Sequence, residues 1–271
     1  MSRKTMTEED GIQITILGTG TSTGVPVIGC SCEVCRSEDP RDKRLRCSCY
    51  VQTQDVDLLI DVGPDFREQA LRAEILNIDA VLITHHHFDH VVGLDDLRPF
   101  LFENREAIPC FTSPDSVEIL FRMFAYIFRD GTYPGTPRLV LKAVDEPFHV
   151  MSRSNQSYDT TVIPIPAEHG DLMIYGYRIG KFAYITDTSR IPDESMAILQ
   201  DLDVLVLDAL RHHSHPMHLT ITQAVDVAQD IGARQTYLIH MAHSVLHAEE
   251  EAKLPHGISF AFDGLTFSAG T

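Results

Sequence analysis

A compact run of metal-binding residues constrains the fold of this chain more than any other feature. The run is His-x-His-x-Asp-His, and it begins one residue after the apolar stretch Ala80–Ile83, which predicts a buried strand. Residues two apart in an extended or loop backbone point the same way, so His85 and His87 can bind one ion. Asp89 and His90, one step further on, can reach a second. The fold must bring other ligands to this strand end, because two ions need more than four side chains.

The alternative is a histidine-rich surface loop that binds metal only incidentally. The spacing disfavours it, because the four candidate ligands follow a strand-like stretch and precede Gly93 and the helix-like stretch Leu94–Phe102. In two-metal hydrolases, divalent ions about 3.5–4 Å apart activate one shared hydroxide and bind both the attacking and the leaving oxygen. The run is typical of such a site.

Three further predicted strand ends carry ligand-type residues. His169 closes a strand and precedes Gly170, which lets the backbone turn sharply. Asp187 follows an apolar strand, and its two carboxylate oxygens can span two cations. His240 follows the strand Tyr237–Ile239. Taken singly, these residues are explained as an exposed loop histidine, a helix N-cap and a hydrogen-bonded core histidine. Together they supply the partners that the histidine run requires.

The order of elements predicts an α/β fold. Apolar strand-like stretches alternate with the helix-like stretch Asp65–Ile75 in the first third, and Thr220–Ile231 has its apolar residues on one helical face. The other predicted strands are Ile12–Leu17, Val56–Val62, Val162–Ile165, Ile174–Ile179, Phe182–Thr186 and Val204–Leu207. Two sheets with helices outside, and ligands on loops at one edge, make a four-layer αββα sandwich. We expect residues 1–271 to form one domain.

The glycine-rich stretch Gly18–Gly24 follows a predicted strand and partly matches a dinucleotide-binding loop. Such a loop requires a helix to open directly after it, so that the helix N-terminus meets a pyrophosphate. Here Val25-Pro26-Val27 and a cysteine cluster follow instead. We therefore predict a tight turn beside the site.

The middle of the chain, at about 103–159, interleaves Phe and Arg before a stretch rich in Gly and Pro at 131–137. A core helix and a surface loop explain this composition. The functional alternative is a lid or substrate-facing insert that brings Arg129, Tyr133 or Arg138 near a phosphate.

Charge and composition narrow the choice of partners. The net charge is −17, with 22 Lys and Arg against 39 Asp and Glu, which disfavours a general nucleic-acid binder. Bound divalent cations reverse the field inside an acidic cleft, so a small anionic substrate is compatible with this charge. The sequence has no stretch typical of a membrane span. The polar stretch Met1–Asp10 lacks the apolar core of a secretion signal, so we expect a cytoplasmic protein.

A second metal site is predicted by Cys30-Ser31-Cys32-Glu33-Val34-Cys35. A disulfide is disfavoured in the cytoplasm, and a Cys-x-x-Cys redox pair leaves the first thiol unexplained. Three thiolates at this density favour a tetrahedral structural zinc with one more ligand, commonly histidine. The candidate is His243, three residues after His240. We expect the remaining cysteines to be small buried residues; they are Cys47, Cys49 and Cys110.

The chain resembles the metallo-β-lactamase superfamily of hydrolases. The ordered motifs of that superfamily match His85, His87, Asp89, His90, His169, Asp187 and His240. The resemblance implies that His85, His87 and His169 hold one ion. It also implies that Asp89, His90 and His240 hold the other, with Asp187 and a hydroxide between them. An aspartate at position 187 is typical of phosphodiesterases and related hydrolases, whereas the secreted β-lactamases usually have a cysteine there.

The cysteine cluster and its distant histidine resemble a narrower group, the PhnP-like branch, which includes phosphoribosyl cyclic phosphate phosphodiesterases. This resemblance implies a homodimer that hydrolyses a small, for example cyclic, phosphate diester with two divalent ions, either Zn, Mn or Fe. The candidate catalytic residues are Asp89 and His218. His218 matches an active-site histidine of the branch, and it lies where it can protonate the leaving alkoxide. The alternative is a flexible polar loop containing His212, His213, His215 and His218.

Other functions stay open at this point. A transfer-RNA 3′-end endonuclease of the same superfamily shares the aspartates and histidines, but it ordinarily needs a basic arm, and none is visible in this sequence. A lactone or thioester hydrolase shares the metals without the cysteine site. The pyrroloquinoline quinone biosynthesis protein B has a similar cysteine cluster, yet its members depart from the full dinuclear set. A purely structural role leaves seven ordered ligand-type residues unexplained.

Overall fold

A computed structural model describes residues 11–102, 104, 106–129 and 135–271 of the chain. It contains two seven-stranded sheets. The first has the order β14-β1-β2-β3-β4-β5-β6. Its strands are β1 (Ile12–Gly18), β2 (Ser48–Gln52), β3 (Asp57–Ile60), β4 (Ala80–Leu82), β5 (Ile108–Thr112), β6 (Leu139–Ala143) and β14 (Thr266–Ala269). Strands β3 to β6 are parallel, whereas β14, β1, β2 and β3 pair antiparallel.

The second sheet has the order β13-β12-β11-β10-β9-β8-β7. Its strands are β7 (Phe148–Met151), β8 (Asp159–His169), β9 (Leu172–Ile179), β10 (Phe182–Ile185), β11 (Val204–Asp208), β12 (Gln235–Ile239) and β13 (Ile258–Phe260). Strands β10 to β13 are parallel, and β7 to β10 pair antiparallel in sequence. Strand β8 therefore runs in the same direction as β10, and both end at the same edge.

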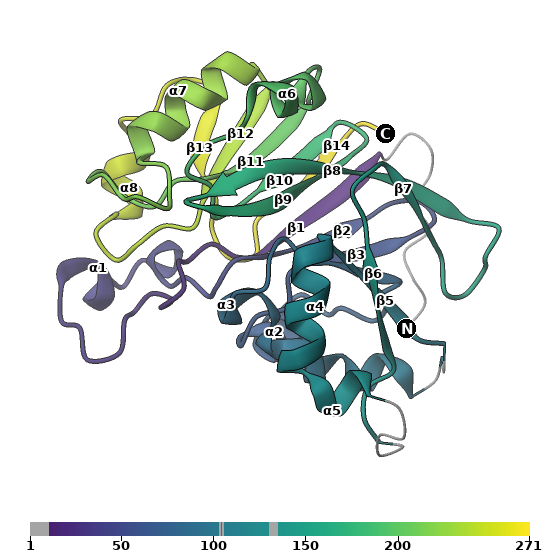
Figure 1. Cartoon of the computed structure of the whole chain (residues 1–271). Coiled ribbons are helices and arrows are strands. Elements are labelled where there is room, and N and C mark those ends of the chain that lie inside the picture. Colours follow the sequence, from purple (N-terminus) through teal and green to yellow (C-terminus); the bar gives the residue numbers. More distant parts are fainter. Residues whose placement is uncertain (1–10, 103, 105, 130–134) are drawn as a thin grey trace.

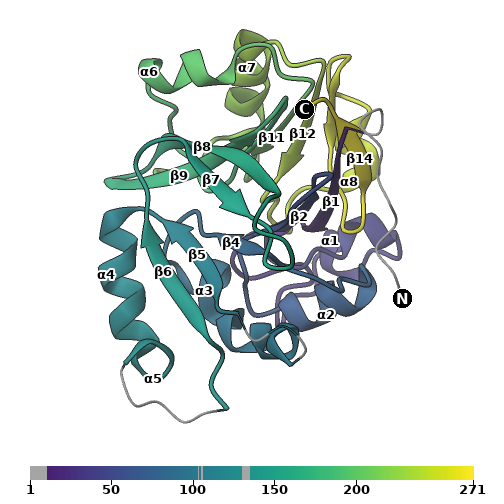
Figure 2. The ribbon, with the colours of Figure 1, turned by 90° about the vertical axis from the view of Figure 1, so that its right-hand side faces the viewer.

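Helices cover the outer faces of both sheets (Figures 1 and 2). The first sheet carries α2 (Phe66–Arg72), α3 (Phe88–Val91), η3 (Val92–Leu101), α4 (Pro114–Met123) and α5 (Ala125–Phe128). The second carries α6 (Asp193–Met196), η4 (Ala197–Leu199), α7 (Ile221–Ile231) and α8 (His247–Glu251). Two short helices, α1 (Glu33–Arg36) and η2 (Pro40–Asp42), lie in the cysteine segment, at the left of Figure 1. The four-layer α/β sandwich predicted from the sequence is confirmed.

Three buried apolar clusters separate the layers. In β3, Leu58 and Ile60 lie in the cluster between the sheets, whereas Leu59 packs with the helices outside the first sheet. In β11, Val206 faces the other sheet and Leu207 faces the helices. Side chains alternate across a strand, so a strand covered on both faces needs a continuous apolar sequence. The uninterrupted apolar stretches of the sequence follow from this arrangement.

Two predicted helices differ from the structure. The stretch predicted as Leu94–Phe102 is η3, a 3₁₀ helix with Pro99 inside it, and proline cannot donate the backbone hydrogen bond of a regular α-helix. The stretch Asp65–Ile75 is helical only as α2. By contrast, α7 is flanked by an N-cap capping box at Thr220 and by Gly232 in the left-handed conformation at its C-cap, close to the predicted bounds.

The middle of the chain is part of both sheets. Strands β5 and β6 extend the first sheet, and β7 pairs with β8 in the second, so residues 103–159 are not an insert between finished elements. These strands complete the sheets that hold the site, and a lid or substrate-facing role for this part of the chain stays a prediction. Tyr133, one of the residues expected near a phosphate, lies outside the described residues, and Arg129 and Arg138 flank that stretch.

The glycine-rich stretch Gly18–Gly24 joins β1 to the cysteine segment. The first helix after it in the described chain is α1, which begins at Glu33. A dinucleotide-binding loop would need a helix directly after the glycines, so the structure agrees with the predicted turn. Among the described residues, no helix is both long and apolar enough to cross a membrane.

Candidate metal centre

The predicted ligands of the first site lie at one edge of the two sheets. His85 and His87 follow β4, and Asp89 and His90 lie on α3. His169 ends β8, Asp187 follows β10 and His240 follows β12. Strands that run in one direction end at the same edge, which is where α/β proteins bind ligands. Asp89 and His90 lie on the short helix α3, whereas the sequence analysis considered an extended or loop backbone for this run.

Three histidines form the first cluster, since ligand atoms of His85, His87 and His169 lie within 4.8 Å of one another. Their ring centroids are 4.5 Å apart for His85 and His87 and 5.2 Å apart for His87 and His169. Burial lowers the pKa of His85 well below its ordinary value and also lowers the pKa of His169. Both rings are then neutral near pH 7, which is the form that binds a metal ion.

The second cluster contains two carboxylates and two histidines. They are Asp89, His90, Asp187 and His240, with ligand atoms again within 4.8 Å of one another. His90 Nε2 lies 3.2 Å from Asp89 Oδ2 and 3.3 Å from Asp187 Oδ1. His240 Nε2 lies 3.2 Å from Asp187 Oδ2. Four-coordinate zinc with ligand bonds of about 2.0–2.2 Å places neighbouring ligand atoms about 3.3–3.5 Å apart. The distances fit such an ion.

Unpartnered nitrogens support the same interpretation. Among the described residues, Nε2 of His85, of His90 and of His240 is buried without a hydrogen-bond partner. The short contacts of the last two with carboxylates are charge contacts, and their angles do not suit hydrogen bonds. Buried polar atoms are normally paired, so orphaned nitrogens that face carboxylates indicate a site for a cation.

The charge balance of the second cluster favours positive charge between its carboxylates. Burial opposes a proton on His90, but the carboxylates of Asp187 and Asp61 outweigh it and raise its pKa well above the ordinary value. Without a metal, a proton therefore supplies positive charge where the carboxylates meet. A divalent ion would replace that proton and leave the imidazole neutral.

Asp187 lies between the two clusters. Its two oxygens contact different histidines of the second cluster, and it also lies within 4.8 Å of ligand atoms of His169 and His218. A residue that bridges two ions needs this placement.

Strained backbone holds three residues at these strand ends. Asp61, Asp187 and His240 have φ of 58°, 54° and 64°, in the left-handed region that side chains other than glycine rarely adopt. Each such residue costs roughly 1–3 kcal/mol, and such strain clusters at functional sites. In this conformation the side chains of Asp187 and His240 take part in the cluster.

Two further carboxylates, which the sequence analysis missed, orient the histidines. Asp61 Oδ2 lies 2.7 Å from His90 Nδ1, and its other oxygen accepts the backbone N–H of Thr84. Asp208 Oδ1 lies 3.3 Å from His240 Nδ1. Both aspartates end an apolar strand sequence, as Asp187 does, and this shared pattern could have identified them. A carboxylate hydrogen-bonded to the far nitrogen of a ligand histidine, as Asp61 is to His90, fixes its tautomer and orientation, whereas Asp208 makes a charge contact with His240.

The structure brings His218 to the site. Its ring stacks on His240 at 4.6 Å and 19°, and its centroid is 4.8 Å from that of His169. Its Nδ1 lies 3.4 Å from Asp208 Oδ1. His215 is its next neighbour at 5.1 Å, whereas His212 pairs with Glu250 away from the cluster. Proximity supports a catalytic role for His218, which stays a prediction.

The cysteine cluster is assembled as predicted. His243 Nδ1 lies 3.3, 3.4 and 3.7 Å from the Sγ atoms of Cys30, Cys32 and Cys35. Zn–S bonds of about 2.3 Å and Zn–N bonds of about 2.0–2.1 Å place S and N about 3.6 Å apart in a tetrahedron. The backbone N–H of Cys35 lowers the pKa of Cys32 to about 6, despite opposing burial, which favours the thiolate. The donor set suits a thiophilic tetrahedral ion.

The other three cysteines are buried, as expected, with Cys47 1%, Cys49 0% and Cys110 0% exposed. Burial raises the pKa of all three thiols, so they are inert neutral side chains.

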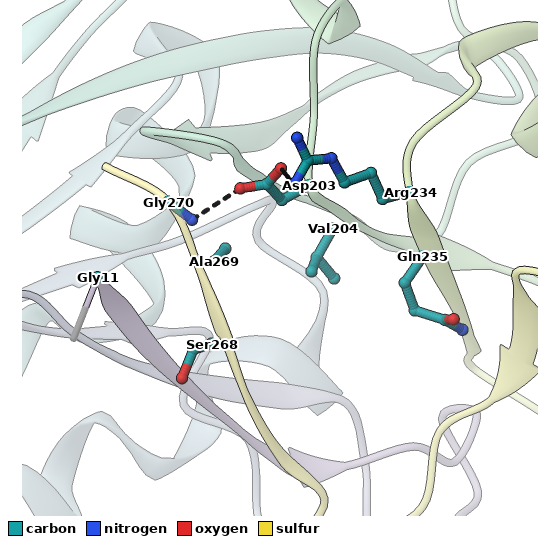
Figure 3. Close-up of a pocket in the computed structure, with 8 residues that line it drawn as sticks. All are labelled: Gly11, Asp203, Val204, Arg234, Gln235, Ser268, Ala269 and Gly270. Atoms are coloured by element: carbon teal, nitrogen blue, oxygen red, sulfur yellow. Dashed lines mark hydrogen bonds and ion pairs between the residues drawn. The ribbon is translucent and has the colours of Figure 1, made fainter. Parts of the chain in front are cut away.

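Two surface grooves lie apart from the metal clusters. Figure 3 shows one of about 420 Å³, in which Asp203 contacts Gly270 and Arg234 beside Val204. It lies at the N-terminal end of β11, whereas Asp208 ends that strand at the metal clusters. The other, of about 680 Å³, lies between α2 and η3 and includes Phe66 and Phe100.

Comparisons with known proteins agree with this geometry. The family model described as beta-lactamase superfamily domain matches residues 57–241. A crystal structure described as a new diphosphatase from the PhnP family is 43% identical with a TM-score of 0.86, over 94% of this chain and 96% of that chain. Zinc-bound PqqB from Methylobacterium extorquens, at 21% identity and a TM-score of 0.73 over 94% of this chain and 99% of that chain, shares the fold.

A Porphyromonas gingivalis protein named octanoyltransferase is 44% identical over 255 residues, which are 92% of this chain and 50% of that protein. This chain therefore spans about half the length of that relative. The name describes the longer protein, and the alignment does not locate its transferase activity in the shared half.

The fold, the ordered clusters and the family match define the class: this chain belongs to the beta-lactamase superfamily, as a hydrolase-family member with the metallo-β-lactamase fold. Within that superfamily it belongs to the PhnP family. Both resemblances identified from the sequence are confirmed.

Proposed function

We propose that this protein is a dinuclear metal-dependent hydrolase of small phosphate diesters. The observation that carries the proposal is the complete ligand set, divided into two clusters, with Asp187 in the second cluster and within 4.8 Å of His169 in the first. An aspartate at this position would offer one carboxylate oxygen towards each ion, and two such ions would stabilise the attacking and leaving oxygens of a displacement at phosphorus.

The residues that would hold the ions follow from the clusters. One ion would be held by His85, His87 and His169, and the other by Asp89, His90 and His240, with Asp187 between them. Such ions lower the pKa of water towards neutrality and neutralise the non-bridging phosphate oxygens. Zn, Mn and Fe all suit these ligands. At the cysteine cluster we propose a structural zinc, because thiolates select it in a tetrahedral site.

The protein's own part in the reaction is orientation and proton transfer. Asp208 holds the Nδ1–H of His218, so in the imidazolium form of the ring Nε2–H is the proton that would pass to the leaving alkoxide. Asp208 also lies 3.3 Å from Nδ1 of His240, so one carboxylate contacts a candidate metal ligand and the candidate proton donor. Asp61 plays the equivalent part for His90.

A second candidate activity is hydrolysis of a disubstituted diphosphate. The 43% identical PhnP-family structure is described as a diphosphatase, which favours this substrate class. In both substrates the attacked phosphorus carries two ester-type oxygen substituents, and the same two ions serve both. The chemical groups attached to the phosphates of the substrate decide which of the two substrate classes is hydrolysed.

Other activities have less support. The net charge of −17 disfavours a transfer-RNA substrate, because phosphate backbones are bound by dense Lys and Arg. Thioester or lactone hydrolysis shares the metals, and the cysteine cluster distinguishes this chain from such enzymes. We also propose a homodimer as the solution state, on the basis of family membership.

The test is turnover of a substrate panel by protein loaded with Mn or Zn. The panel holds bis(p-nitrophenyl) phosphate, a phosphoribosyl cyclic phosphate, 2′,3′-cyclic nucleotides, a disubstituted diphosphate, a lactone, an acyl thioester and a precursor transfer RNA. Asp89→Asn is the blank, because it removes one ligand charge. We expect turnover of diesters that is lost in the blank. Inactivity on every phosphate substrate, with metal content verified, would refute the proposal.

A further inference from the structure

Arg44 is the largest fully buried side chain among the described residues. It belongs neither to the two histidine and aspartate clusters nor to the cysteine cluster. Its side chain is 0% exposed and that of its partner Asp42 is 1% exposed. Burying two charges costs free energy that their attraction offsets only when further hydrogen bonds complete the site. The contacts of Arg44 therefore show which part of the fold this pair holds in place.

The guanidinium holds the turn that carries His243. Its Nη1 donates to the carbonyl of Ala242 at 3.1 Å, and its Nη2 donates to the carbonyl of Val245 at 2.7 Å. Asp42 Oδ1 accepts from Nη2 and from the backbone N–H of His247, both at 2.9 Å. The ion pair thus fixes the main chain on both sides of His243.

The backbone of Arg44 holds the thiol half of the same cluster. Its N–H donates to the carbonyl of Val25 at 2.7 Å, and the N–H of Val25 donates back at 2.8 Å. Val25 packs with Val34 and Cys35 in a small apolar cluster. Arg44 therefore joins the cysteine segment to the histidine turn.

The same turn carries a candidate ligand of the dinuclear site. His240 lies two residues before Ala242, and the N–H of Met241 donates to the carbonyl of Thr19 at 2.9 Å. A Cβ added at Gly20 would lie 2.7 Å from the carbonyl oxygen of Arg44, so this loop passes directly over the arginine backbone. The turn is held from both sides.

We propose that Arg44, paired with Asp42, is a positioning residue that sets His243 against the three thiols and holds the turn beginning at His240. Metal affinity at the cysteine cluster then depends on a side chain that touches no metal. This inference rests on the proposed metal sites but not on the proposed substrate.

The test compares zinc affinity and the cobalt(II) spectrum of variants with those of the wild type. Arg44→Lys keeps the charge but cannot donate to several carbonyls in the planar geometry of a guanidinium. We expect zinc binding at the cysteine cluster to weaken about 10- to 100-fold, as for other residues that orient ligands, and the thiolate-to-cobalt absorption to change. Arg234→Lys is the matched control, since Arg234 is an 80% exposed arginine paired with Asp203. It should behave as wild type.

The double variant Asp42→Asn/Arg44→Met tests the inference if Arg44→Lys does not fold. It removes both buried charges and keeps an oxygen acceptor for the N–H of His247. We expect it to fold with the same loss of zinc affinity. Wild-type zinc affinity and cobalt spectrum in a folded variant would overturn the inference, even if its melting temperature fell. Loss of zinc affinity in the variants, together with a wild type inactive on every diester, would refute the substrate proposal alone.

Discussion

Oδ2 of Asp61 lies 2.7 Å from Nδ1 of His90, and both side chains are buried. This contact orients a metal ligand from behind, because Nε2 of the same ring faces the carboxylates of Asp89 and Asp187. The N–H and hydroxyl of Thr84 also donate to Asp61, which prevents the carboxylate from turning away. The second cluster therefore depends on a residue that is not one of its ligands.

Asp61→Asn should weaken metal binding at the second cluster about 10- to 100-fold, since it removes the charge that orients His90. Activity should recover at high Mn concentration, because the ligands themselves remain. Calorimetric titration with Mn checks this, and Asp95→Asn, at a 42% exposed carboxylate, is the control. An unchanged Mn affinity would show that Asp61 is only a structural residue.

His218→Ala should discriminate between leaving groups. We expect nearly unchanged turnover of bis(p-nitrophenyl) phosphate, because p-nitrophenolate leaves without a proton. Turnover of an alkyl diester should fall about 10²- to 10⁴-fold. Asp208→Asn should shift the same ratio in the same direction, through the contact between Asp208 and His218.

His213→Ala, at an exposed histidine of the same loop, is the control for this comparison. Equal losses on both substrates in His218→Ala would exclude a role as proton donor.

Cys32→Ser should abolish tight zinc binding at the cysteine cluster and lower the melting temperature, because a thiolate that caps α1 and faces His243 is lost. Zinc content is measured by elemental analysis after mild chelation has removed metal from the dinuclear site of histidines and aspartates. Cys110→Ala, at a buried thiol away from the cluster, should keep its zinc. Retention of zinc in Cys32→Ser would mean that the structural site has been assigned wrongly.

Asp263 should make stability depend on pH. Burial raises its pKa to about 6, although the N–H of Leu45 and the hydroxyl of Thr19 donate to it. A carboxyl whose pKa is higher in the folded state than in the unfolded state stabilises the protein fully below about pH 4, and this contribution is lost as the pH rises through about 6.

The free energy of unfolding of the wild type, minus that of Asp263→Asn, should therefore fall by up to about 3 kcal/mol between pH 4 and pH 7. Denaturant titrations of both proteins at each pH measure the difference, and effects of the metal sites cancel between them. A difference that is constant over this range would contradict the raised pKa of Asp263.

The amino-acid sequence determined the layer architecture and the identity of the candidate ligands. Continuous apolar stretches such as that ending at Asp208 are readable because a parallel strand is covered on both faces. The ligand spacing is readable because His85 and His87 are local in sequence, and His169, Asp187 and His240 each follow a strand. Local periodicity does not distinguish a 3₁₀ helix from an α-helix, so the helix predicted at Leu94–Phe102 was located but its type, 3₁₀ in η3, was not.

Only the tertiary structure decided which side chains stand behind the ligands. Asp61 reaches His90 across 29 residues, and the guanidinium of Arg44 reaches the carbonyl of Ala242 across 198. Such contacts depend on how strands from distant parts of the chain meet at one sheet edge. A single buried aspartate or arginine has the same appearance in a sequence wherever its partner lies. The strand ends therefore predict which residues gather, whereas packing decides how each imidazole is turned and held.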